Sequence, residues 1–208
     1  MLAFVLLFSA HVGWRDLATA RDRAGELAHR AAALDDQDAW THVVLGYLHT
    51  MKRNFEAANQ AYSTAIRINP NFAAAYGWRS FAKAHAGIVD EAIDDSKMAR
   101  RLSPQDPQNI IFQGGEALAY FMSDRFDEAA AVIADVIRQR PQFEGAWRLE
   151  CTALARAGRL DEAKAVLARI LEKQPNLTAA QLRASLPYPT AETLEKFVGG
   201  LVLAGLPE

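Results

Sequence analysis

The sequence predicts an all-α solenoid, in which antiparallel pairs of helices stack in chain order around one continuous core. Four stretches that share one pattern end at prolines spaced 34, 37 and 34 residues apart: Pro70, Pro104, Pro141 and Pro175. An alanine stands twelve residues before each proline and a second small or branched residue stands five before it, at Ala58 and Ala65, Ala92 and Ala99, Ala129 and Val136, and Ala163 and Ile170. Positions seven apart lie on one helical face, so this face marks a close contact between helices. A second amphipathic segment precedes each stretch, which makes each unit a pair of helices.

The N-terminal segment, residues 1–38, predicts a degenerate unit. Its stretch "RDRAGELAHRAAALDD" has Ala24 and Ala31 at the seven-residue spacing, and Asp36 stands one period before the first proline. This stretch is expected to form the second helix of the unit, and about residues 2–13 the first. The opening run "MLAFVLLF" is too short to cross a bilayer and lacks a cationic segment, so we interpret it as the apolar face of a packed helix. A missing upstream domain would leave the same pattern.

Four full repeats follow, each with a helix A and then a helix B, over residues 39–72, 73–106, 110–143 and 144–177. The residues between A and B are Arg53-Asn54, Gly87, Asp124 and Gly158. Glycine, asparagine and aspartate tolerate a left-handed backbone, so we expect sharp antiparallel turns there. The proline then ends helix B. The insertion "SPQDPQN" precedes the third repeat, where Asp106 is expected to cap the next helix and Pro107 to start it.

The C-terminal residues 178–208 predict a truncated unit and a capping helix. The stretch "TAAQLRAS" starts a fifth helix A, which "LPYP" cuts short. Thr190 is expected to cap a final helix that ends near Gly205 and carries Leu194, Phe197, Val198 and Leu201 on one side. A solenoid needs such a lid because its last unit otherwise exposes half a core. The whole chain is thus expected to form one solenoid.

Composition limits the classes of function. Half of the 208 residues are hydrophobic and 23% are charged, which suits a chain with a buried core. The formal net charge of −2 gives no global reason to bind nucleic acid or an anionic membrane, and neither partner is expected. The single cysteine, Cys151, allows no intramolecular disulfide, so we expect a cytoplasmic location.

Motifs for chemistry are absent from the sequence. It has no nucleotide-binding glycine loop, no zinc-binding H-E-x-x-H and no C-x-x-C, so we expect no enzyme activity, no cofactor and no metal. His42 and His49 lie seven apart and could suggest a metal pair. No carboxylate or cysteine stands at a complementary spacing, which favours a structural role for both. Cys151 is interpreted as a small buried hydrophobe because small residues pack between helices at its position.

The repeats resemble the tetratricopeptide repeat family. The resemblance includes Leu45-Gly46, Trp147 at the large aromatic position of helix A, and Tyr76 at the same place in the second repeat. It implies a right-handed superhelix of antiparallel helix pairs, with helix A on the concave side. His42 and Gln113 depart from the pattern because they occupy the aromatic position in the first and third repeats.

Three polar residues, Arg79, Glu116 and Glu150, stand where the family usually has a core leucine. A buried charge is costly unless it is paired, so we expect Arg79 and Glu116 to meet between the second and third repeats. A polar ligand site is the alternative.

The ending "LPYPTAETLEKFVGGLVLAGLPE" carries a narrower resemblance. It is similar to the end of the tetratricopeptide region in bacterial class III adenylate cyclase-like proteins and in some winged-helix regulators. This resemblance implies an alternative function, in which the chain is the regulatory segment of a signalling protein or transcription regulator whose output domain is absent from the sequence.

The family resemblance also implies which residues face the concave groove. These are expected to be mainly aromatic and apolar for three repeats and basic in the fourth, and they are the candidate partner-binding residues: Trp40, Val43, Tyr47, Met51, Trp78, Phe81, His85, Ile111, Leu118, Phe121, Met122, Arg148, Thr152 and Arg156. An apolar surface of this extent predicts a non-catalytic scaffold that binds a peptide or helix of another protein, with an apolar body and an acidic end.

Two further expectations concern this groove. Neighbouring units, the terminal helix or a second copy of the chain could instead fill it. Val43 and Tyr47 stand where chaperone-binding members of the family carry lysine and asparagine, so a carboxylate clamp is not expected. If the groove is open, replacing Trp78 and Phe81 by alanine should weaken partner binding and leave thermal stability nearly intact.

Overall fold

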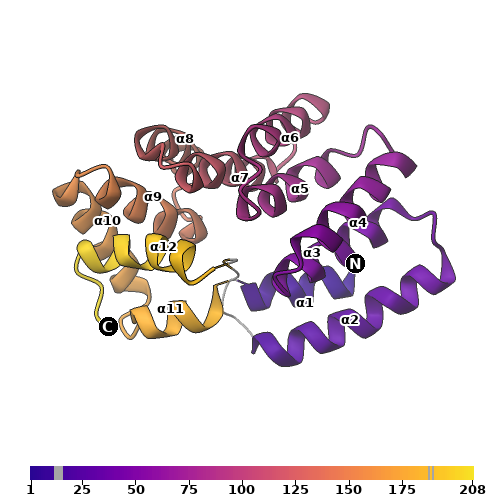
Figure 1. Cartoon of the computed structure of the whole chain (residues 1–208), viewed down its shortest axis with the longest axis horizontal. Coiled ribbons are helices and arrows are strands. Elements are labelled where there is room, and N and C mark those ends of the chain that lie inside the picture. The colour runs from indigo at the N-terminus through magenta and orange to yellow at the C-terminus, as the bar shows by residue number, and fades with distance from the viewer. Residues whose placement is uncertain (12–15, 187, 189) are drawn as a thin grey trace.

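The computed structural model describes residues 1–11, 16–186, 188 and 190–208, and these residues form helices and no strand. The helices are α1 (Leu2–His11), α2 (Leu17–Leu34), α3 (Ala39–Met51), α4 (Phe55–Ile68), α5 (Ala73–His85), α6 (Val89–Leu102), α7 (Asn109–Met122), α8 (Phe126–Gln139), α9 (Glu144–Arg156), α10 (Leu160–Lys173), α11 (Ala179–Ser185) and α12 (Ala191–Leu203). Consecutive helices pack as hairpins, and the hairpins follow one another along a curved stack (Figure 1). The predicted all-α superhelical solenoid is confirmed.

The turns between helices A and B have the predicted left-handed backbone. The φ angles are +59° at Arg53, +77° at Gly87, +61° at Asp124 and +80° at Gly158. In the first repeat the arginine takes this conformation. Asn54 instead caps α4, because its side chain accepts a hydrogen bond from the backbone N–H of Ala57 at 3.2 Å.

Two helix starts differ from the sequence predictions. Helix α2 begins at Leu17, several residues before the predicted stretch, because the Asp16 carboxylate caps it by accepting the Thr19 N–H at 2.8 Å. Helix α7 begins at Asn109 and not at Pro107. The Asp106 carboxylate accepts the N–H of Gln108 at 2.8 Å and closes a turn before the helix, so Pro107 lies in that turn.

The C-terminal end forms two helices, α11 and α12, and the second one closes the stack. Thr190 caps α12 through a capping box with Thr193, and Gly205, at φ +110°, follows the helix. Helix α12 packs against α9, whereas α11 packs mainly on α12. The helix that lies beside the last full repeat is therefore the capping helix and not the fifth helix A.

The buried side chains form two apolar clusters that meet along α5 and α7. One cluster runs from Ala3 to Phe112 and the other from Ala84 to Leu206, and Phe81 packs against both. The alanines that recur twelve residues before each proline, Ala58, Ala92, Ala129 and Ala163, have no exposed surface. The close helix contact that the repeat predicts is thus the spine of the core.

Candidate partner-binding surface

Two of the three polar residues of helix A, Arg79 and Glu116, pair with helix B and not with one another. The Arg79 guanidinium donates two hydrogen bonds of 2.7 Å to the two carboxylate oxygens of Asp95, on α6. Lys83 lies 2.9 Å from the same carboxylate. Glu116 pairs with Arg100, also on α6. The predicted pair of Arg79 with Glu116 is wrong because α6 lies against both α5 and α7 and supplies the partner of each.

Glu150, the third polar residue of this set, has no such partner. Its Oε2 atom is buried and accepts no hydrogen bond from the described residues. Burial raises the pKa of this carboxyl group, and the positive charges of Arg169 and Arg159 oppose the rise. The Glu150 carboxyl group therefore holds its proton more readily than the carboxyl group of an exposed glutamate does.

An apolar cavity of about 120 Å³ lies on the inner side of the stack. Its walls come from α1, α3, α4, α5, α7, α8, α9 and the segment before α9. The structure brings six of the candidate partner-binding residues together around it: Tyr47, Met51, Trp78, Phe81, His85 and Ile111. The described lining residues include no aspartate, glutamate, lysine or arginine, so the cavity favours apolar contacts.

Helix α1 covers the N-terminal part of this inner surface. The Phe4 ring lies 5.1 Å from Trp40, 5.6 Å from Tyr47 and 5.4 Å from Trp78, between ring centroids. Tyr47 and Trp78 are consequently only 1% and 4% exposed. The candidates Val43 and Met51 are buried as well.

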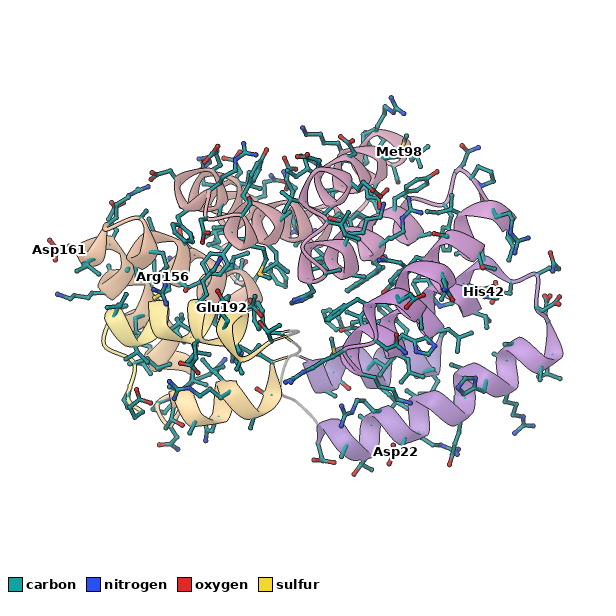
Figure 2. All side chains as sticks on the ribbon, in the orientation of Figure 1. Asp22, His42, Met98, Arg156, Asp161 and Glu192 are labelled. Carbon is teal, nitrogen blue, oxygen red and sulfur yellow. The ribbon has the colours of Figure 1, made fainter. Side chains whose placement is uncertain are left out.

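Helix α12 covers the C-terminal part, where the sequence predicts a basic end. The Thr152 hydroxyl donates to the carbonyl of Phe197 at 2.7 Å, and Thr152 has no exposed surface. Arg156 donates to the carbonyls of Lys196 and Glu195 at 2.9 and 3.1 Å. Figure 2 shows Arg156 beside α12. The prediction that Thr152 and Arg156 form an open basic end is therefore wrong, because both bind the backbone of the chain's own last helix.

The other candidates at this end differ in exposure. Phe121 is fully buried and packs against the Phe197 ring at 5.8 Å, and Leu118 is buried. Arg148 is half-buried and donates to the side chain of Gln174 at 2.7 Å. Met122 is half-buried too. Along the whole inner surface, the half-buried apolar candidates are Trp40, Phe81, Ile111 and Met122.

The segment after α11 also reaches the inner surface. Tyr188 packs edge-on against His85, with ring centroids 5.0 Å apart, and lies 5.1 Å from Phe197. Arg53 donates to the carbonyl of Leu186 at 2.8 Å. Phe4, Phe8, Tyr188 and Phe197 are inner-surface residues that the repeat pattern could not indicate, because they lie in the degenerate ends. Their aromatic character within apolar segments was the available signal.

The residues considered for chemistry have structural surroundings. Burial raises the pKa of the Cys151 thiol to about 12, so the nucleophilic thiolate is disfavoured. Among residues 1–11, 16–186, 188 and 190–208, no group of three or more histidine, cysteine, aspartate or glutamate side chains could hold a metal ion. The His42 ring lies 2.8 Å from the carbonyl of Asp36, through Nε2. Within the same ranges, each helix is too short or too polar to span a membrane.

Comparisons with known proteins agree with this architecture. Residues 120–186 match the family model for the tetratricopeptide repeat. PilW, a widely conserved type IV pilus biogenesis factor, superposes with a TM-score of 0.70 and 16% identity, over 97% of this chain and 86% of that chain. A thermophilic tetratricopeptide protein of Thermus thermophilus superposes with a TM-score of 0.69 and 18% identity, over 97% of both chains.

A curated relative is also similar over part of the chain. The small glutamine-rich tetratricopeptide repeat-containing protein 2 of Mycosarcoma maydis is 32% identical over 92 residues, which are 44% of this chain and 25% of that protein. The match thus spans about a quarter of the relative's length. Residues 120–186 thus match the tetratricopeptide repeat family, and the chain has the all-α repeat superhelix of tetratricopeptide solenoids.

Proposed function

We propose that the chain is a non-catalytic scaffold that binds a peptide or helical segment of another protein at the inner cavity. One observation carries this proposal: helices A of all four repeats contribute to one apolar cavity, and Phe81 and Ile111 at its wall remain half-buried. Burying such aromatic and aliphatic side chains against a partner is a main source of affinity in helix-in-groove recognition.

The surface around the cavity limits the chemistry of the partner. The two arginines that the sequence predicts to bind an acidic end of the partner already bind groups of the chain itself. Arg156 binds the backbone of α12, and Arg148 binds the side chain of Gln174. The binding segment is therefore expected to be apolar, and an acidic end is not required. The proposed partner is another protein or peptide. The single cysteine supports a cytoplasmic location as part of this proposal.

Peptides selected from a displayed random library against the full chain test this proposal. Phe81→Ala should weaken their binding about tenfold, since an anchor residue contributes on the order of 1–2 kcal/mol. Phe126→Ala is the matched control, because Phe126 is a half-buried phenylalanine of a helix B and does not line the cavity. Calorimetric titration measures both affinities. Equal binding by the wild type and Phe81→Ala would show that the inner cavity is not the binding site.

The alternative function, a regulatory segment of a cyclase-like or winged-helix protein, rests on the resemblance of the C-terminal sequence. It concerns which domain is joined to the scaffold and is compatible with the same cavity. The genomic sequence upstream of the first codon tests it. An upstream frame for a cyclase or winged-helix domain would support it, and a stop codon directly upstream would oppose it.

A further inference from the structure

Helix α1 is bound to the inner surface as a partner helix would be. Phe4 and Phe8 lie one turn apart on α1, with stacked rings 6.1 Å apart. Phe4 contacts Trp40, Tyr47 and Trp78, and Phe8 contacts Trp78 at 6.5 Å. The inner surface of the first two repeats thus already receives an apolar helix through a pair of aromatic side chains.

The rest of α1 is unevenly buried: Ala3, Leu7 and Ala10 are buried, whereas Leu2 and Val5 are exposed. The helix has only ten residues, "LAFVLLFSAH", and the side chains of Leu2 and Val5 are 59% and 52% exposed. A helix shorter than about 12 residues is only marginally stable in water on its own. The order of α1 consequently depends on its contacts with α2 and with the aromatic cluster of Trp40, Tyr47 and Trp78.

The contact of α1 with this surface is also incomplete. The 120 Å³ cavity is lined by Phe8 on one side and by Phe81, Ile111 and Phe143 on others. The Trp78 side chain, at its wall, is 4% exposed, and its indole N–H is buried with no acceptor among the described residues. A helix with one more apolar side chain, beyond the aromatic pair, could fill space that α1 leaves empty and so bind more favourably.

We propose that α1 is a built-in competitor for the inner surface, and that the partner supplies an apolar helix with two aromatic side chains one turn apart. This inference rests on the proposed function and names the partner's chemistry. A partner must displace the aromatic pair of α1 before it binds, so the population with α1 in place lowers its apparent affinity. A partner with a third apolar side chain that enters the cavity would overcome this competition.

A labelled peptide of residues 1–11, with a lysine tail for solubility, tests the inference on full-length chains. The double variant Phe4→Ala with Phe8→Ala should bind the peptide at least tenfold more tightly than the wild type, because its own α1 competes poorly. The double variant Leu2→Ala with Val5→Ala is the matched control and should bind as the wild type does, since these side chains are exposed. Fluorescence anisotropy measures the affinities. A Phe4→Ala, Phe8→Ala variant that binds no more tightly than the wild type would overturn the inference.

A second measurement uses the unmodified chain, in case the double variant loses helix content. Saturating peptide should increase hydrogen exchange of the α1 amides, whereas a peptide with both phenylalanines replaced by alanine should not. Unchanged exchange of α1 with the intact peptide would contradict the inference. If library peptides still depend on Phe81 in that case, the scaffold function stands and only the competition by α1 is wrong.

Discussion

Asp95, on α6, is a buried carboxylate that pairs with side chains of the neighbouring helix α5. Asp95 is 6% exposed and receives both Arg79, through two hydrogen bonds of 2.7 Å, and Lys83, at 2.9 Å. Arg79 also donates to the Ser63 hydroxyl at 3.1 Å. Asp95 therefore compensates Arg79 and shares Lys83 with Glu91, which lies 2.9 Å from the ammonium group, and these pairs link α5 to α6 within the second repeat.

Asp95→Ala should destabilise the chain by about 3 kcal/mol, because it leaves the largely buried Arg79 guanidinium without a counter-charge, whereas Lys83 keeps Glu91 at 2.9 Å. Asp94→Ala is the control, since Asp94 is adjacent and exposed. Urea unfolding followed by circular dichroism measures the free energy of unfolding of both variants. A loss below about 1 kcal/mol for Asp95→Ala would mean that water compensates the Arg79 guanidinium.

The free energy of unfolding is expected to depend on pH through the carboxyl group of Glu150. Burial raises the pKa of its carboxyl group in the folded chain above that in the unfolded chain. The folded state then holds the proton more strongly, so this group lowers the stability as pH rises from the ordinary glutamate pKa through the raised one. Glu150→Gln should therefore be more stable than the wild type near pH 8 and should lose this advantage near pH 4.

Thermal unfolding of Glu150→Gln and the wild type at both pH values checks this expectation. Glu172→Gln is the control, because Glu172 is an exposed glutamate on the neighbouring helix α10. An advantage for Glu150→Gln that is the same at pH 4 and pH 8 would contradict a role for the carboxyl charge.

At the scale of helices, close approach depends on glycine. A Cβ atom added at Gly200 of α12 would lie 2.0 Å from the Thr152 hydroxyl oxygen and 3.0 Å from the Thr152 Cα. The hydroxyl can rotate but the Cα cannot move without the backbone of α9. This absence of a side chain lets Thr152 and Arg156 reach the carbonyls of α12 and explains how the last helix covers the predicted basic end.

Gly200→Ala should destabilise the chain by about 1–3 kcal/mol, since overpacking forces α12 away from α9. Gly25→Ala should instead be neutral or stabilising by up to about 1 kcal/mol, because the nearest atom to its added Cβ lies at 3.5 Å and alanine favours the helix. Denaturant titration of the two variants compares them directly. Similar effects of both substitutions would show that helix propensity, and not the contact with α9, dominates.

At the scale of the whole molecule, both ends of the chain return to the inner surface of the stack. Helix α1 covers it from one side and α12 from the other (Figure 1). Leu186 contacts Arg53 in the turn of the first repeat, and Tyr188 contacts His85 at the end of α5. What remains accessible is the middle, around Phe81 and Ile111. The expectation that Trp78→Ala would leave stability intact does not suit a side chain that is 4% exposed and contacts several rings. Phe81 is the better probe of binding.

The sequence by itself determined the repeat, the helix pairs and their turns. Each of these depends on local chemistry: an alanine where helices touch, a glycine or aspartate with positive φ, and a proline that ends a helix. Only the tertiary structure decided that Arg79 pairs with Asp95 and that α12 binds Thr152 and Arg156. Those contacts depend on how the superhelix brings distant segments together. A repeat of period 34 does not predict the packing of terminal segments that do not repeat.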